Sequence, residues 1–190
     1  MIPKQNTPEW REWRNMKIGA SDAPIIMGMS PWKNPVQLWK EKLGFIPEPP
    51  MTDKMQRGVD LEPAALEAFN AYTNASYEPL VMIHKQRPWM IASLDGWEPD
   101  SRQGVEIKCP GPRAHKQALE GTIHHYYVPQ LQHQIEVANL DRIHYWSFDG
   151  EKGVHLVCER DQAYIDRIMM HEKWFYQCML DVTEPIFKYD

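Results

Sequence analysis

The chain is poor in cysteine, has no long apolar run and carries no excess of positive charge. Its three cysteines show no CxxC spacing, which argues against a disulfide framework and supplies too few thiolates for a four-thiolate iron–sulfur cluster. No apolar run approaches the roughly 20 residues needed to span a bilayer, and no leader-like segment opens the chain, so we expect a cytoplasmic protein without a membrane partner. A net charge of -5 argues weakly against coating nucleic acid through overall charge, although an acidic total is compatible with a local basic groove.

What is present is enough apolar material for one substantial core. Hydrophobic residues make up 43% of 190 residues, and we find no shift in composition, internal repeat or low-complexity segment. We therefore predict a single domain over residues 1–190.

Helix start signals divide the first part of the chain. Thr7 offers an N-cap with Pro8 at the first helical position, and Asn34 with Pro35 repeats this pattern. Apolar spacing over residues 54–72 predicts a longer helix, in which Pro63 is tolerable only near a helix start or as a kink.

Strand-like runs follow. They cover residues 77–85 and 89–96, the second ending at an Asp-Gly turn signal, and residues 104–109 complete an antiparallel meander. Asp95 is therefore expected to end its strand.

The remaining elements fix the fold class. We predict helical pieces within residues 115–139, a hairpin from residues 142–150 and 153–160, and a helix over residues 161–181. This order indicates an α/β (α+β) domain with a central mixed β-sheet flanked by helices.

A short motif on the third predicted strand carries chemistry. Glu106 and Lys108 are two residues apart and so share one face of the strand, and the meander brings Asp95 to the same end of the sheet. Paired carboxylates suit Mg²⁺, and partial burial would lower the pKa of Lys108 so that it orients or deprotonates water. Taken alone, the motif is more often a surface ion pair on a strand edge.

The surroundings of this motif resemble a known family. Asp95 in "SLDG" lies eleven residues upstream of Glu106 in "EIKCP", a Glu-bearing helix precedes both, and "YYVPQLQHQ" follows. Together they resemble the lambda-exonuclease type of phage recombination nuclease, the YqaJ-like viral recombinase branch of the PD-(D/E)xK superfamily. The resemblance runs from "WRNMKIGASD" to "QLQHQIEVA", about two thirds of the chain, and implies a restriction-endonuclease-like core.

The resemblance assigns the metal and catalytic residues. Asp95, Glu106 and the carbonyl of Ile107 would be metal ligands, and Lys108 the catalytic lysine. Glu62 would reach a second ion directly or through water. Without the resemblance, Glu62 would be interpreted as a solvated carboxylate in the first turn of a helix.

Two residues of the "YxxQ" helix are implied to face the site. Gln130 would orient the attacking water or a phosphate, and Tyr127 would lie beside it. The alternative is an ordinary polar helix face.

A pocket for a 5′-phosphate is also implied. Its matches are Lys17, Ser21 and Ser93, and Ser21 can equally be a simple N-cap. The family usually has Arg where this chain has Lys17, and Arg14, one turn earlier, can take its place.

The resemblance implies a Mg²⁺-dependent 5′-to-3′ exonuclease on linear double-stranded DNA ends, with two ions per site and Mn²⁺ as the alternative metal. Its product would be a 3′ single-stranded tail, passed from a ring-shaped homotrimer to a phage single-strand annealing protein. Two alternatives stay open, namely a related endonuclease and a catalytically silent DNA-binding or assembly module.

A last expectation concerns the role of four tryptophans near the N-terminus. Their roughly helical spacing favours core or subunit packing over base stacking, although one of them could still contact a DNA end. They are Trp10, Trp13, Trp32 and Trp39.

Overall fold

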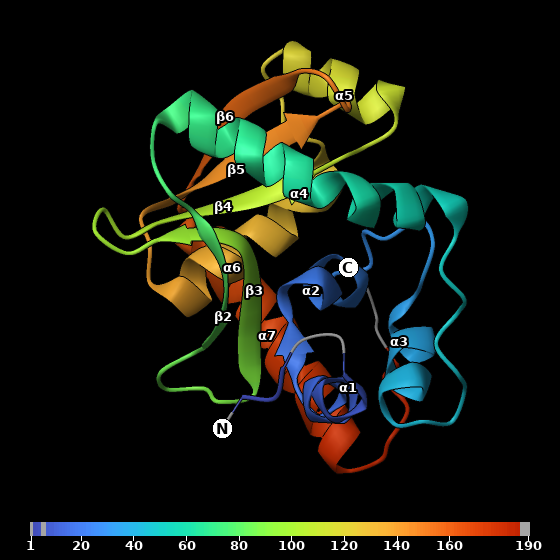
Figure 1. Ribbon diagram of the computed structural model, residues 1–190. Coiled ribbons are helices and arrows are strands. Elements are labelled where there is room, and N and C mark those ends of the chain that lie inside the picture. The colour runs from blue at the N-terminus through green and yellow to red at the C-terminus, as the bar shows by residue number, and fades with distance from the viewer. Residues whose placement is uncertain (1, 5–6, 187–190) are drawn as a thin grey trace.

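Six strands form one mixed sheet, and helices cover both of its faces in the computed structural model, which describes residues 2–4 and 7–186 (Figure 1). The strands are β1 (Ile18–Gly19), β2 (Glu78–Ile83), β3 (Met90–Glu98), β4 (Gln103–Lys108), β5 (Arg142–Phe148) and β6 (Gly153–Glu159). The α-helices are α1 (Pro8–Asn15), α2 (Ala23–Ile26), α3 (Pro35–Lys42), α4 (Asp53–Thr73), α5 (Pro112–Leu119), α6 (Val128–Ala138) and α7 (Gln162–Leu180). Short 3-10 turns are η1 (Ala20–Asp22) and η2 (His125–Tyr127). The expected fold class, a mixed sheet flanked by helices, is confirmed.

Two strands share one edge of β3 and leave a gap between them. The strand β2 pairs antiparallel with β3 over nearly its whole length, so β1 and β4 share the opposite edge. There β1 pairs in parallel at Met90 and Ile91, whereas β4 pairs antiparallel from Gly96 onward. Residues 92–95 therefore lie between the two pairings. The rest of β4 pairs in parallel with β5, and β5 forms the expected hairpin with β6.

One local expectation was wrong. The Asp-Gly pair at Asp95 does not end β3, because Gly96 continues the pairing opposite Val105. A Cβ on Gly96 would lie 2.8 Å from Val105 Cγ1 and from Tyr77 Cβ, so this glycine serves close packing. Pro63 lies at an exposed position inside the 21-residue helix α4, which continues on both sides of it, and the kink stays a prediction.

The core has one apolar cluster on each face of the sheet and a third among the N-terminal helices. On one face, Leu131 and Ile135 of α6 pack with Ile165 of α7 against the sheet. On the other, Phe69 of α4 packs against Val105 of β4. In Figure 1, α4 accordingly crosses in front of the sheet and α6 and α7 lie behind it. No helix within the described residues is both long and apolar enough to cross a membrane.

The tryptophans divide into two kinds. Trp10 and Trp39 are each 6% exposed, and Trp13 packs on Trp10, in agreement with the packing interpretation. Trp32 is 74% exposed and is therefore not part of the core, while packing against another subunit stays a prediction.

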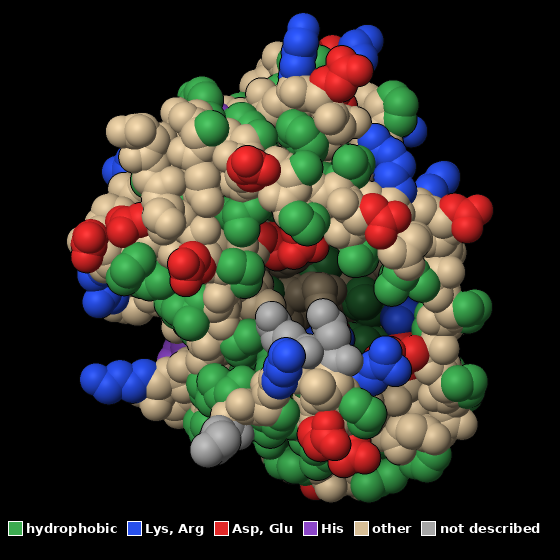
Figure 2. Space-filling view, viewed as in Figure 1, with side chains coloured by type: hydrophobic (Ala, Val, Ile, Leu, Met, Phe, Trp, Pro, Cys, Tyr) green, Lys and Arg blue, Asp and Glu red, His purple; other side chains and the backbone are tan. Residues whose placement is uncertain are grey.

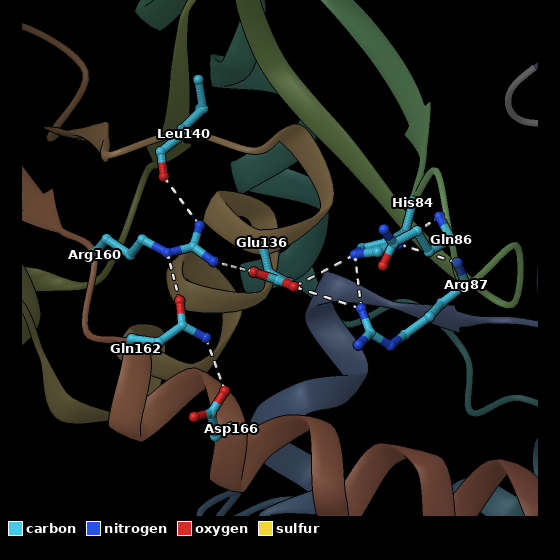
Figure 3. A network of polar contacts seen from close by, with 8 residues as sticks. All are labelled: His84, Gln86, Arg87, Glu136, Leu140, Arg160, Gln162 and Asp166. Atoms are coloured by element: carbon cyan, nitrogen blue, oxygen red, sulfur yellow. Dashed lines mark hydrogen bonds and ion pairs between the residues drawn. The ribbon is translucent and has the colours of Figure 1, made fainter.

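A polar network fastens the far end of α6 to two neighbouring turns (Figure 3). The Glu136 carboxylate lies among Arg160, Arg87 and His84, and Arg160 also donates to the Leu140 carbonyl at 3.2 Å. The network thus joins α6 to the β2–β3 turn and to the start of α7.

Candidate active site

The gap between β1 and β4 opens into a cavity of about 220 Å³. It lies at the split edge of β3, and Figure 2 shows the molecular face hollowed between the α4 side and the side of α1, α2 and α3. Acidic side chains lie at the upper margin of this hollow in the view and basic ones at its lower margin. The lining residues are Arg14, Gly19, Ala20, Ser21, Glu62, Ile91, Ser93, Asp95, Glu106, Ile107, Lys108 and Gln130.

This lining joins nearly all the residues singled out from the sequence. The structure brings Glu62 from α4, Asp95 from β3, Glu106 from β4 and Gln130 from α6 to one cavity. Ile107 also lines it.

Glu106 is the centre of the hydrogen bonding. It is only 2% exposed, and its Oε1 accepts from the Lys108 ammonium and from the Gln130 amide. Its Oε2 accepts from the Gln134 amide. A buried carboxylate needs such donors, because leaving it unpaired costs several kcal/mol.

Gln134 is the residue that sequence reasoning missed. It is fully buried, and its Nε2 also donates to the Ser93 carbonyl at 3.2 Å, so it ties Glu106 to β3. Its Oε1 has no hydrogen-bond partner in the structure. The one available signal was its position four residues after Gln130, which places both amides on one face of α6.

The three carboxylates disfavour one another's charge. Burial, followed by the nearby Glu106 carboxylate, raises the pKa of Asp95 well above its usual value, even though Asp95 Oδ2 accepts the Ile107 N–H at 2.7 Å. The same two causes raise the pKa of Glu62. A cavity with this electrostatic character is stabilised by an added cation.

The expectation of a lowered lysine pKa was wrong for this metal-free arrangement. Burial alone would lower the pKa of Lys108, but the Glu106 and Asp95 carboxylates and the hydrogen bond to Glu106 outweigh it and raise that pKa above its usual value. The expectation counted burial without the paired carboxylates. Lys108 is therefore an ammonium here, and it lies 5.5 Å from the centre of the Tyr127 ring.

The donor set fits a hard divalent cation. Carboxylate and carbonyl oxygens are the ligands Mg²⁺ prefers, and Asp95, Glu106 and the Ile107 carbonyl could supply them, with Glu62 in the same lining. As the described side chains stand, no group of three or more His, Cys, Asp or Glu converges to hold a metal. Glu106 instead contacts Lys108 and the α6 amides.

The N-terminal wall of the cavity has an anion-binding character. Arg14 Nη2 donates to Ser21 Oγ at 2.9 Å, and both residues line the cavity with Ser93. Lys17 is directed elsewhere, because its ammonium donates to the Pro88 carbonyl at 2.9 Å and lies over the Trp13 ring. The structure therefore brings together three of the four residues matched to a phosphate pocket.

A buried ion pair supports that wall. Asp22 Oδ2 accepts from Gly19 N at 2.8 Å and from the Lys42 ammonium at 2.8 Å. Lys42 also donates to the Lys17 carbonyl. These contacts fix the backbone around β1, and a Cβ on Gly19 would lie 3.7 Å from the Arg14 guanidinium.

Comparison with known proteins gives both a family and a fold. The sequence model described as the YqaJ-like viral recombinase domain matches residues 9–141. The chain is 28% identical over 174 residues to the uncharacterized protein YqaJ of Bacillus subtilis (strain 168), covering 88% of this chain and 54% of that protein. The chain thus spans about half the length of this curated relative.

Two solved structures share the architecture. An alkaline exonuclease (LHK-Exo) from Laribacter hongkongensis is 25% identical, with a TM-score of 0.78 and coverage of 93% of this chain and 94% of that one. A phage-related exonuclease from Haemophilus somnus 129PT is 15% identical, with a TM-score of 0.64, and covers 90% of this chain and 100% of its own; at that identity the likeness concerns the fold.

Proposed function

The chain belongs to the YqaJ-like viral recombinase domain family, and on that basis we propose that it is a metal-dependent exonuclease acting on the ends of linear double-stranded DNA. Degradation runs 5′ to 3′ and leaves a 3′ single-stranded tail for annealing. The observation that carries the proposal is the single cavity that holds Asp95, Glu106 and Lys108 beside Arg14 and Ser21. The alkaline exonuclease from Laribacter hongkongensis, similar over 93% of this chain, supports it.

Hydrolysis uses the acidic wall of the cavity, which Glu62, Asp95 and Glu106 form. Asp95, Glu106 and the Ile107 carbonyl would hold one Mg²⁺ or Mn²⁺ ion, and Glu62 a second. Bound there, such ions lower the pKa of water and neutralise charge on the phosphoryl group. Gln130 orients the water, and the Lys108 ammonium donates to the phosphate under attack. The water oxygen bonds to phosphorus while the bond to the 3′ oxygen breaks, and that oxygen takes up a proton.

The 5′-to-3′ direction of degradation follows from the N-terminal wall of the cavity, which carries Arg14 and Ser21. Arg14 and Ser21 hold a 5′-terminal phosphate, which positions the next phosphodiester at the carboxylates. Cleavage releases a 5′-mononucleotide and leaves a new 5′-phosphate on the remaining strand. That phosphate can occupy the same pocket, so the reaction repeats from the shortened end.

Assembly is part of the proposal. The chain forms a ring-shaped homotrimer around DNA in the cytoplasm and passes its product to a phage single-strand annealing protein. A ring keeps the substrate from leaving between cuts. Native mass measurement should give a trimer, and a monomer at working concentration would contradict this part.

The first experiment compares three DNA substrates with Mg²⁺, namely linear duplexes with 5′-phosphate ends, linear duplexes with 5′-hydroxyl ends, and closed circles. We expect only linear DNA to be lost, faster from phosphorylated ends, and no loss with Lys108→Ala. Cutting of circles would favour a related endonuclease. Metal-independent binding without cutting of any substrate would favour a silent DNA-binding module.

A second experiment separates Arg14 from Lys17. A charge-assisted hydrogen bond to phosphate is worth about 1.5–3 kcal/mol, so Arg14→Ala should reduce the preference for 5′-phosphate ends roughly 10- to 100-fold. Lys17→Ala, the matched control, should leave it nearly unchanged because Lys17 points to Pro88. The reverse result would assign the pocket to Lys17.

A further inference from the structure

An exposed indole lies on a loop that is fixed at both ends. Trp32 is 74% exposed, yet its backbone N–H and that of Lys33 both donate to Ser30 Oγ. The Lys33 ammonium contacts the buried Glu41 carboxylate, and Asn34 caps α3. The loop therefore holds Trp32 out toward solvent in a defined position, at the hydrophobic cost of an unburied indole.

A line of aromatic rings connects this indole to the cavity. The Trp32 ring meets Tyr126 edge-on at 4.8 Å between centroids, and Tyr126 meets Tyr127 at 5.5 Å. Tyr127 in turn lies 5.5 Å from the Lys108 ammonium. We call Trp32, Tyr126 and Tyr127 the aromatic shelf.

The shelf lies alongside both walls of the cavity. The Tyr126 hydroxyl is hydrogen-bonded to Ser30 and lies close enough to Lys108 and Asp22 to be affected electrostatically by both. Lys108 marks the acidic wall, and Asp22 supports the backbone beside Arg14. A nucleotide that spans the two walls would therefore have the shelf beside its sugar and base.

We propose that Trp32 is a stacking site for the base of the 5′-terminal nucleotide, a proposal that rests on the nuclease function above. Aromatic stacking accepts every base, because each presents a flat π-face. It holds the terminal nucleotide unpaired from its complement while Arg14 binds its phosphate. Trp32 thus positions the nucleotide and takes no part in bond breaking.

The test combines removal of the Trp32 indole with removal of the terminal base. Duplexes carrying a 5′-phosphate are prepared with an intact or an abasic 5′-terminal nucleotide, and each is digested by wild type, Trp32→Ala, Trp32→Phe and Phe45→Ala. Removing the base should slow wild type about tenfold, mainly through KM. It should have little further effect in Trp32→Ala, because the two changes remove the same contact. Trp32→Phe should restore most of the base dependence.

Phe45→Ala is the matched control. Phe45 is 57% exposed but packs on Trp39, so its loss should leave the base dependence as in wild type. A base dependence that persists in full in Trp32→Ala would overturn the proposal. So would a loss of trimer in Trp32→Ala with equal slowing on both DNAs, which would assign Trp32 to a subunit contact.

A second readout needs no cleavage. With EDTA present, 2-aminopurine at the 5′-terminal position should lose fluorescence on binding wild type, and should keep it with Trp32→Ala. Quenching without any metal-dependent cutting would support the stacking site while refuting the nuclease. Cutting of linear DNA without quenching would refute the stacking site alone.

Discussion

Two glutamates at α6 are held in different ways. Glu106 projects from β4 onto the amides of Gln130 and Gln134 and onto one lysine. Glu136, on the far part of α6, contacts two guanidinium groups and an imidazole (Figure 3). Two of the three donors to Glu106 are neutral amides, which fix the carboxylate in place and leave Lys108 alone to offset its charge, whereas two guanidinium groups contact Glu136. Glu106 can therefore still attract a cation, whereas Glu136 stabilises the packing of α6 against its neighbours.

The largest effects should come from neutralising each glutamate. Glu106→Gln should lower nuclease activity more than about 100-fold, since loss of even a group that only supports a ligand costs 10- to 100-fold. Glu136→Gln should leave activity nearly intact and lower the free energy of unfolding by about 2–3 kcal/mol, because two arginines lose their partner. Digestion assays measure the activity of both variants, and urea unfolding measures their stability. Equal loss of activity in both variants would erase the distinction.

Next come two buried glutamines of α6. Gln134→Leu should weaken Mn²⁺ binding about 10- to 100-fold, measured by calorimetry, because Glu106 loses the donor on its Oε2. Gln132→Leu is the matched control, since Gln132 bonds to the Glu159 carbonyl and to the Asp161 N–H away from the cavity. It should destabilise the fold and leave Mn²⁺ affinity unchanged. Weakened binding in both would mean that helix integrity alone matters.

A smaller effect concerns pH and the charge that the amides leave in place. Burial and Glu106 raise the pKa of Asp95 in the folded state above 3.8, so the metal-free protein loses stability as pH rises through the interval between the unfolded and folded values. Asp95→Asn removes this loss. The variant should therefore be the more stable at pH 8 without metal, and the difference should vanish near pH 3, where both side chains are neutral. Thermal unfolding at the two pH values decides it.

The smallest effect lies within the Glu136 network. Arg87 is partly exposed and its Nη1 lies 3.6 Å from the glutamate, whereas Arg160 is closer and also donates to the Leu140 carbonyl. Arg87→Ala should cost about 0.5 kcal/mol and Arg160→Ala about 1–2 kcal/mol in urea unfolding. A larger loss of stability in Arg87→Ala than in Arg160→Ala would show that the contact to the β2–β3 turn stabilises the network more.

What the sequence predicted well was decided by short-range rules. Side-chain alternation placed Glu106 and Lys108 on one face, and cap residues such as Thr7 and Asn34 mark where α1 and α3 begin. The prediction was wrong where tertiary packing overrides local preference. Gly96 resembles a turn residue but serves close contact with Val105.

The candidate site shows the same limit. The raised pKa of Lys108 depends on Asp95, from another strand, and on how closely Glu106 approaches. Gln134 differs from any polar helix residue only through its burial against Ser93. The direction of Lys17 away from the cavity depends on a carbonyl 71 residues away in sequence. None of these distances is encoded in local pattern.

The split edge of β3 has a consequence for the newly made chain. The cavity draws on α1, β1, α4, β3, β4 and α6, so its parts are synthesised over most of the chain's length. Until α6 has emerged and packed, Glu106 lacks both amides that hold it. A partly synthesised chain therefore contains the acidic residues without their geometry, and the proposed nuclease site can form only after α6 has been synthesised and has packed.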